Sequence, residues 1–276
     1  MIIGQKEFKE GRHTYVMGIL NVTPDSFSDG GRYQLEEHAV AHAQQMLADG
    51  ADIIDVGGES TRPGYIPVSE EEEIERVCGV IERLRREFAP VISIDTYKSR
   101  VAEEAVRAGA VLINDIWGFR RDRKMASVAK KYQTACCLMH NREQAVYSDL
   151  MQEICEDLKE SLRIARAAGV MPECIMIDPG IGIGFGKTLE QNLEVIQRLD
   201  ELHELGCPLL LGTSRKSVIG QTLGLPVNER VEGTLATTAY AVMSGCLFVR
   251  VHDVKENVRF IKMMEAISGV SDDQKE

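Results

Sequence analysis

The sequence predicts an α/β fold, a (β/α)₈ TIM barrel with a short hairpin-like extension at the N-terminus. Eight short strand-like runs alternate with amphipathic helical stretches along the chain, and no linker or short repeat divides them. The runs are too short and apolar to be half-exposed strands, and with eight βα units they favour a closed barrel over an open doubly wound sheet. We therefore expect residues 1–276 to form one domain.

The expected elements follow one another in regular order. The N-terminal extension covers residues 1–13, and Glu10 and Gly11 suggest the turn of a small hairpin. Strands are expected at 15–20, 53–56, 91–94, 111–113, 135–138, 175–177, 209–211 and 247–251. Helices of crossover length are expected at 36–49, 70–88, 99–108, 149–168, 189–205 and 229–244, with a final helix at 254–267. The polar residues 271–276 are expected to fray.

The composition excludes several classes of protein. A formal net charge of -11 argues against non-specific nucleic-acid binding, because a phosphate backbone requires a basic face. No apolar run approaches the roughly 20 residues of a membrane span, and the N-terminus turns polar too soon for a signal peptide, so we expect a cytoplasmic protein. The seven cysteines lack CxxC spacing, which indicates neither a zinc site nor a disulfide framework.

Polar residues follow every expected strand, where the loops of such a barrel build the active site. The loops after the first two strands, at 21–31 and 57–64, are rich in Gly, Ser, Thr and Pro. Any single Asp or Asn after a strand could merely cap the next helix. Recurrence at all eight strands instead indicates one common site, to which the later strands contribute Asp95, Asn114, Asp115, His140, Asn141, Asp178, Arg250 and His252.

Basic residues from three loops could provide a local anion site in this acidic protein: Arg62, Arg215, Lys216, Arg250 and His252. His252 could equally be a structural histidine. Lys216 could form a Schiff base in an aldolase-like barrel, if its amine is desolvated.

The glycine-rich segment 180–188 after the sixth strand is not a nucleotide-binding motif. Ile181 stands where a P-loop requires its first glycine. The glycines at 182, 184 and 186 also fail the GxGxxG spacing of dinucleotide-binding folds. We interpret the segment as a flexible or tightly turning loop.

Several segments, in order, make nearly the entire chain resemble the dihydropteroate synthases. They are GILNVTPDSFSDGG (18–31), DVGGESTRPG (55–64), SIDT (93–96), NDI (114–116), DPG (178–180), GTSRKS (212–217) and RVHDV (250–254). Each segment is moderately specific, and the ordered combination is very specific. The resemblance implies a transferase of folate biosynthesis (EC 2.5.1.15) and a sulfonamide target. Its members condense 6-hydroxymethyl-7,8-dihydropterin pyrophosphate with p-aminobenzoate to give 7,8-dihydropteroate and pyrophosphate.

The resemblance implies catalytic roles for Asn21, Asp95, Lys216 and Arg250. It also implies a pterin slot inside the barrel, lined by Asp95, Asn114, Ile116, Met139, Asp178, Gly212, Lys216 and Arg250. A carboxylate such as Asp178 can accept paired N–H donors from the pterin edge, and a guanidinium such as Arg250 can stack on the flat ring. A pterin lacking those donors would leave a buried carboxylate unpaired, so the slot would be selective.

The remaining substrate positions are implied in the same way. Pyrophosphate would be held by Asn21, Thr61, Arg62, Arg250 and His252, with Asn21 also ligating Mg²⁺. The p-aminobenzoate would contact Thr61, Pro63, Phe185, Lys216 and Ser217. Phe185 lies in a loop that is two residues longer than the family pattern DPGxGFxKx. The loops 21–31 and 58–65 would close over the reacting atoms.

The implied mechanism is a substitution at the pterin methylene in which the bond to pyrophosphate breaks before the bond to the amine forms. The family also implies a homodimer. A corrinoid-dependent methyltransferase domain could use a similar pterin barrel, although it would not need the segments SRKS (214–217) and RVHD (250–253) or the first loop (21–31). A non-catalytic pterin-binding paralogue is the other alternative, but it should have lost loop or basic residues, and no such loss is visible.

Overall fold

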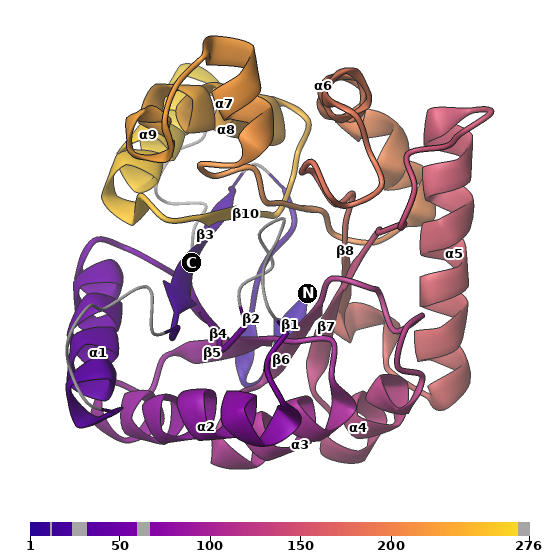
Figure 1. The fold of residues 1–276 in the computed structure, drawn as a ribbon. Coiled ribbons are helices and arrows are strands. Elements are labelled where there is room, and N and C mark those ends of the chain that lie inside the picture. Colours follow the sequence, from indigo (N-terminus) through magenta and orange to yellow (C-terminus); the bar gives the residue numbers. More distant parts are fainter. Residues whose placement is uncertain (12, 24–31, 60–66, 270–276) are drawn as a thin grey trace.

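The computed structural model describes residues 1–11, 13–23, 32–59 and 67–269. Within these residues, eight parallel strands follow the order β8-β7-β6-β5-β4-β3-β10-β9 (Figure 1). The two edges meet where Ile177 bridges Leu209 and the Ile177 amide donates to the Pro208 carbonyl over 3.0 Å. The expected barrel is confirmed. Its strands are β3 (Tyr15–Asn21), β4 (Ile53–Gly57), β5 (Val91–Asp95), β6 (Leu112–Asp115), β7 (Ala135–Met139), β8 (Ile175–Asp178), β9 (Leu210–Leu211) and β10 (Phe248–Val251).

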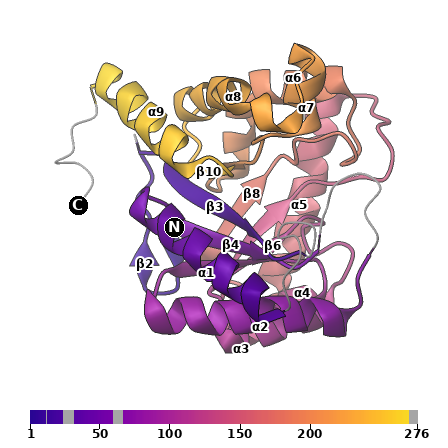
Figure 2. The ribbon, with the colours of Figure 1, turned by 60° about the vertical axis from the view of Figure 1, so that its left-hand side comes forward.

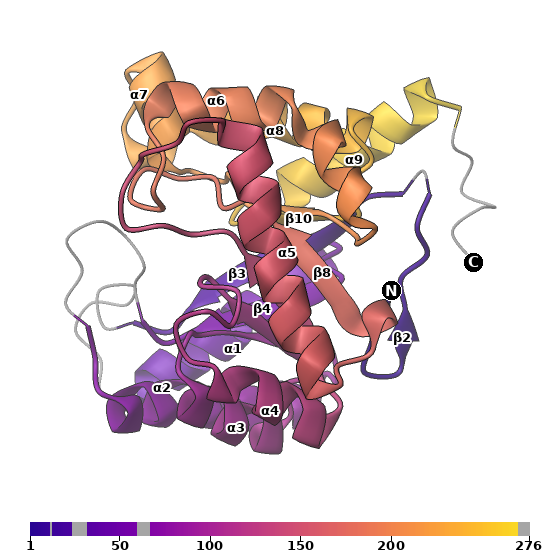
Figure 3. The ribbon, with the colours of Figure 1, turned by 90° about the vertical axis from the view of Figure 1, so that its right-hand side faces the viewer.

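Helices surround the strands on the outside (Figures 1 and 3). They are α1 (Arg32–Ala48), α2 (Glu70–Glu87), α3 (Ser99–Ala108), α4 (Lys124–Tyr132), α5 (Leu150–Ala168), α6 (Leu189–Gln197), α7 (Ser217–Leu223), α8 (Val231–Met243) and α9 (Val254–Ile267), with 3-10 turns η2 (Pro172–Cys174), η3 (Leu199–Leu205) and η4 (Val227–Glu229). The expected helices are confirmed within a few residues, except that the stretch 189–205 is divided between α6 and η3. No helix among the described residues is long and apolar enough to cross a membrane.

The start of α2 illustrates how the sequence fixes a helix. The Ser69 hydroxyl accepts the Glu72 amide over 3.1 Å, which satisfies one of the unpaired N–H groups of the first turn. Four glutamates occupy that turn and Arg85 and Arg86 the last, so both ends complement the helix dipole.

The N-terminal extension is a hairpin, but its turn is not the expected one. Strands β1 (Ile2–Ile3) and β2 (Lys6–Glu7) pair antiparallel around Gly4, whose φ of +60° suits glycine. The expectation of a turn at Glu10 and Gly11 is therefore wrong. Figure 2 shows β2 beside one end of the barrel, and Phe8 after it is fully buried.

The barrel interior is divided into an apolar half and a polar half. At the amino-terminal ends of the strands, the hairpin packs into one apolar cluster with inward-facing residues, which include Met1, Ile3, Phe8, Met17, Ile53, Leu112, Cys137, Met176, Leu210 and Phe248. Residues farther along the same strands, such as Asp55, Asn114 and Arg250, are polar. Because all strands are parallel, these polar side chains share the carboxyl-terminal end of the barrel.

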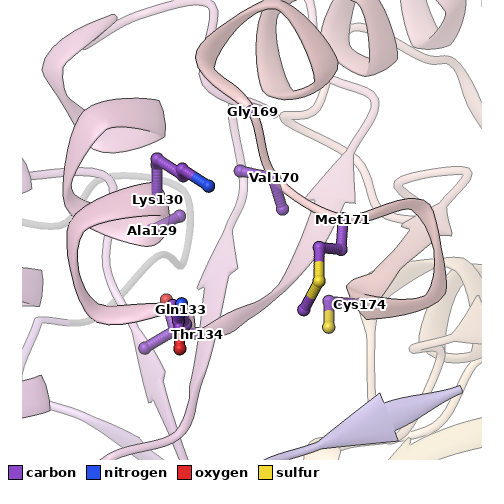
Figure 4. A pocket seen from close by; sticks show the side chains of 8 residues that line it. All are labelled: Ala129, Lys130, Gln133, Thr134, Gly169, Val170, Met171 and Cys174. Carbon is purple, nitrogen blue, oxygen red and sulfur yellow. The ribbon is translucent and has the colours of Figure 1, made fainter.

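A small pocket at the opposite, amino-terminal end does not resemble a substrate site. It lies between the end of α4 and the connection from α5 to β8 (Figure 4). Its lining consists of Ala129, Lys130, Gln133, Thr134, Gly169, Val170, Met171 and Cys174. Its volume of about 30 Å³ suffices for a water molecule rather than a substrate.

Candidate active site

The centre of the polar half is a guanidinium between two carboxylates. Arg250 Nε donates to Asp55 Oδ2 over 2.6 Å, and Arg250 Nη2 donates to Asp95 Oδ2 over 2.6 Å. Asn114 Nδ2 also donates to Asp55 Oδ2, over 3.2 Å. The four side chains come from β10, β4, β5 and β6, so long-range strand pairing alone brings them together.

A second pair of charged groups lies at the ends of β8 and β9. Asp178 Oδ1 accepts the Gly180 amide over 2.7 Å, and Lys216 Nζ donates to the Ile181 carbonyl over 2.6 Å. The lysine and the carboxylate thus hold successive residues of the same loop.

Gly212 is the point where both groups of side chains meet. A Cβ on Gly212 would lie 3.6 Å from Asp178 Oδ2, 3.7 Å from Arg250 Cβ and 3.8 Å from Lys216 Nζ. Any larger residue at this position would therefore extend into the space between these groups. The absence of a side chain leaves room for a flat ligand there.

Burial dominates the electrostatics of the site. Burial raises the pKa of Asp95 above its usual range, although the positive charge of Arg250 lowers it. Burial likewise raises the pKa of Asp178, although the positive charge of Lys216 lowers it. It lowers the pKa of Lys216 to about 8, although Asp178 opposes that shift. Asp55, Asp95 and Asp178 outnumber Arg250 and Lys216, so the slot has an excess of hydrogen-bond acceptors. Such a site suits a ligand that is rich in N–H donors.

Asn21 lies at the mouth of the barrel beside the carboxylate of Asp95. A Cβ on Gly57, between them, would lie 3.6 Å from both Asn21 Oδ1 and Asp95 Cβ. His252 is nearby in sequence to Arg250, and its ring Nδ1 and backbone amide both lie 3.1 Å from Ser214 Oγ. Among the described residues, no group of three His, Cys, Asp or Glu side chains could hold a metal ion.

Arg215, one of the basic residues expected to provide an anion site, is paired with Asp253. This residue has a left-handed backbone (φ +57°), and its Nε donates to Asp253 Oδ2 over 2.9 Å. The ion pair compensates its charge. Thr61, Arg62 and Pro63, which are also expected site residues, lie outside the described residues, as do most of the loops 21–31 and 58–65 and the segment 271–276.

Phe185 lies next to Lys216 despite the longer loop. The Lys216 Nζ is 5.0 Å from the centroid of the Phe185 ring, within the range of a cation–π contact. The structure thus brings Phe185 to the lysine expected to contact the same substrate.

The other expected site residues are at least partly buried. Ser217 is the first residue of α7 and is partly buried. Ile116 and Met139 are buried and supply apolar surface.

The loop between β8 and α6 turns tightly, as the sequence suggested. Gly180, Gly182, Gly184 and Gly186 all have positive φ, which side chains rarely adopt. At Gly180 a Cβ would lie only 1.9 Å from the His140 carbonyl oxygen, so no other residue fits without movement of the backbone.

Asp55 belongs to this polar cluster, although its place after no strand end gave it no expected role. It is fully buried, and its Oδ1 has no hydrogen-bond partner within the described part of the chain. The signal was present, because a carboxylate stands within the apolar strand Ile53–Gly57, two residues from both the inward-facing Ile53 and Gly57. Alternation therefore places it inside the barrel.

A closed barrel with a charged, partly buried slot at the carboxyl ends of its strands defines a barrel enzyme with its active site at that end. Comparisons with known proteins refine this class. A family model described as "Pterin binding enzyme" matches residues 17–252. The dihydropteroate synthase of Clostridium beijerinckii is 60% identical over 268 residues, which cover 97% of this chain and 99% of that protein. The Bacillus subtilis enzyme of the same name is 55% identical over 254 residues, covering 92% and 88%.

Solved structures agree with these relatives. A crystal structure of dihydropteroate synthase from Clostridium difficile in the presence of pteroic acid has a TM-score of 0.92 and 52% identity, and the match covers 95% of this chain and 99% of that one. The Xanthomonas albilineans enzyme with 4-aminobenzoic acid has a TM-score of 0.89 and 41% identity, with 94% of each chain covered. The chain belongs to the dihydropteroate synthases, within the pterin-binding enzyme family.

Proposed function

We propose that this chain condenses 6-hydroxymethyl-7,8-dihydropterin pyrophosphate with p-aminobenzoate, giving 7,8-dihydropteroate and pyrophosphate. The observation that carries the proposal is the slot, which is rich in hydrogen-bond acceptors. Arg250 is held there between Asp55 and Asp95. The pair of Asp178 and Lys216 lies across from it, around Gly212. Family membership supplies the reaction, and the slot supplies groups that fit its substrates.

The pterin would lie in the slot with its aminopyrimidinone edge toward the carboxylates. Asp178 Oδ1 is already bonded to a backbone amide, so its Oδ2, which points toward Gly212, is the oxygen proposed to accept pterin N–H groups. The Asn114 amide would satisfy further polar atoms of the ring. The guanidinium of Arg250, fixed by two carboxylates, offers a flat cation against which the ring can stack.

Asn21, His252 and Arg250 are proposed to form the described part of the pyrophosphate site. The amide oxygen of Asn21 lies beside Asp95 at the mouth, where it fits Mg²⁺, which takes few protein ligands and completes its shell with phosphate and water oxygens. When bound, Mg²⁺ would stabilise negative charge on the leaving pyrophosphate. Thr61 and Arg62 remain proposals from the family resemblance alone.

The p-aminobenzoate would bind between Phe185, Lys216 and the start of α7 at Ser217. The aromatic ring of Phe185 provides an apolar face for the benzoate ring. Among the described residues, no side chain caps the start of α7, so the positive end of this short helix is available to a carboxylate. Pro63 and Thr61 are proposed to complete this position.

The reaction exchanges one bond for another at the pterin methylene. The carbon–oxygen bond breaks and its electron pair leaves with pyrophosphate, while the pterin ring delocalises the positive charge. The buried carboxylates around Arg250 favour that charge because the interior strengthens electrostatic interactions. The amine lone pair then forms the carbon–nitrogen bond, and one amine proton is released. The neutral arylamine needs no strong base in the site.

We also propose a homodimer in the cytoplasm. Large apolar side chains are exposed on the neighbouring elements α7, α8 and α9: Leu223, Tyr240, Met243, Met263 and Ile267. Covering them with a second copy would remove apolar surface from water. The seven cysteines are free thiols, which supports a reducing compartment.

The test is a reaction that contains the protein, dihydropterin pyrophosphate, p-aminobenzoate and Mg²⁺, with dihydropteroate measured by mass and pyrophosphate measured in parallel. Equal amounts of both products, dependent on all components, are expected. Binding of the pterin without any product would contradict the proposal and favour a non-catalytic pterin-binding protein.

A further inference from the structure

A buried lysine near the active site contacts both the β8–α6 loop and the residue that follows β7. Lys187 is only 3% exposed, although it ends a glycine-rich loop. Its Nζ donates to the Gly180 carbonyl over 3.0 Å, so the two ends of the loop are bonded to each other. Burying an ammonium group is unfavourable unless polar partners compensate it, and such a residue requires an explanation.

The lysine belongs to a hydrogen-bonded chain that reaches the surface. Lys187 Nζ lies 2.8 Å from His140 Nδ1, and His140 Nε2 lies 3.0 Å from Asp157 Oδ2 on α5, which packs beside β7. With Lys187 as the donor, His140 Nδ1 accepts and Nε2–H donates to Asp157. Burial lowers the pKa of His140 to about 3, in agreement with a neutral ring. Arg142 Nε, 2.6 Å from the same carboxylate oxygen, ends the chain.

A single residue joins this chain to the active site. Gly180 donates its N–H to Asp178 Oδ1 over 2.7 Å and accepts from Lys187 through its carbonyl over 3.0 Å. Its backbone is left-handed (φ +71°) and packed so closely against His140 that no side chain fits. The next carbonyl, of Ile181, accepts from Lys216. The two lysines therefore hold consecutive peptide groups from opposite sides.

We propose that Lys187 is a positioning residue, which acts through Gly180 to orient the pterin-binding carboxylate of Asp178 and to fix the loop that carries Phe185. This inference rests on the proposed function, because it assigns Asp178 to the pterin. A displacement of about 1 Å at a substrate-positioning group can reduce activity by up to about 100-fold, so a residue without substrate contact can still determine binding.

A purely structural role makes a different prediction. If Lys187 only filled space or stabilised the fold, its replacement by an apolar residue of similar length would change stability and leave the affinity of the folded protein unchanged. Buried ion pairs are often replaceable in this way without loss of structure. Affinity for a pterin, measured on folded protein, separates the two roles.

The experiment compares Lys187→Met with Lys131→Met in the full-length protein. Lys131 is an exposed lysine on α4 that pairs with Glu103, so it controls for the substitution itself. The dissociation constant of 6-hydroxymethylpterin is measured by fluorescence, together with the thermal unfolding midpoint and the KM for p-aminobenzoate. We expect Lys187→Met to weaken pterin binding by about 10- to 100-fold and to raise KM, and Lys131→Met to match the wild type.

Two further variants keep the inference testable if Lys187→Met does not fold. Asp157→Asn weakens the far end of the chain, and should weaken pterin binding by a smaller factor. Lys187→Gln retains a donor without the charge, and should restore part of the affinity lost in Lys187→Met. If Lys187→Met folds, the double variant with Asp157→Asn should bind no more weakly than Lys187→Met alone, because the residues act as one unit.

Wild-type affinity in folded Lys187→Met, or in Asp157→Asn if the former does not fold, would overturn the inference. Failure of the proposed function has a separate signature, since the wild-type protein itself would then form no dihydropteroate.

Discussion

Replacing Asp55 with Asn tests whether the fixed guanidinium is the basis of pterin binding. The substitution keeps the size of the side chain but removes the charge that faces Arg250 Nε at 2.6 Å. It also changes the acceptor to which Asn114 donates at 3.2 Å. Because Asp95 still pairs with Arg250, one of the two carboxylate partners remains.

The expected loss follows from these contacts. Removing one partner of a buried ion pair costs about 3–5 kcal/mol when no other partner remains. A hydrogen bond to a charged group contributes about 1.5–3 kcal/mol. With Asp95 still in place, we expect the smaller range, which corresponds to a roughly 10- to 150-fold change in an equilibrium constant. We expect most of this change in pterin affinity, since the slot and not the core is altered.

The assay is fluorescence titration of 6-hydroxymethylpterin, followed by steady-state kinetics at saturating p-aminobenzoate. Asp52→Asn is the matched control, because Asp52 precedes the same strand at its amino-terminal end and bonds to Lys6 and the Val16 amide. Asp52→Asn should bind the pterin as the wild type does. Unchanged pterin affinity in Asp55→Asn would refute the role assigned to the Arg250 pair.

Three further outcomes are expected. Phe185→Ala should raise the KM for p-aminobenzoate severalfold and leave pterin affinity unchanged; an unchanged KM in steady-state assays would remove Phe185 from the amine site. Lys98→Met should lower the free energy of unfolding by about 3–5 kcal/mol in urea denaturation. The reason is that Lys98 Nζ lies 2.6 Å from the buried carboxylate of Glu59 and 2.7 Å from that of Glu73. A loss under about 1 kcal/mol, which is typical of a surface ion pair, would contradict this expectation. Burial lowers the pKa of Lys187 in the folded chain from about 10.5 to about 7, so the unfolded chain binds more protons between these pH values. The contribution of Lys187 to the free energy of unfolding should therefore rise with pH across this window, and Lys187→Met should remove that rise in urea denaturation at several pH values; parallel curves for the two proteins would contradict it.

The strands were predictable because their signal is local. Each is a short apolar run between polar loops, and all eight expected strands match the structure within two residues at either end. Helices α4 and α7 were missed because they are only nine and seven residues long, too short to show a clear periodicity. The hairpin turn was misplaced because Glu10 and Gly11 look like a turn, whereas packing of Phe8 under the barrel selects Gly4.

The contents of the site were partly predictable, and its pairings were not. Position after a strand indicated Asp95, Asp178 and Arg250, because parallel strands place such residues at one end. No local pattern indicates that Arg250 bonds to Asp55, since 195 residues separate them in the chain. The role of Lys187 was hidden for the same reason, because its partner His140 comes from another strand end.

The apolar half of the barrel explains how the polar half can hold its charges in fixed positions. Phe8, Met17 and Phe248 fill the amino-terminal end, and this packing holds the strands at constant register. The inward-facing side chains two positions farther along, such as Asp55 and Arg250, are therefore held on rigid strands. The same packing excludes water from the amino-terminal end of the barrel, so each ion pair lies in a medium that screens its charges weakly. A slot built in this way is arranged before the substrate binds, and loss of one charge therefore affects binding more than it affects the fold.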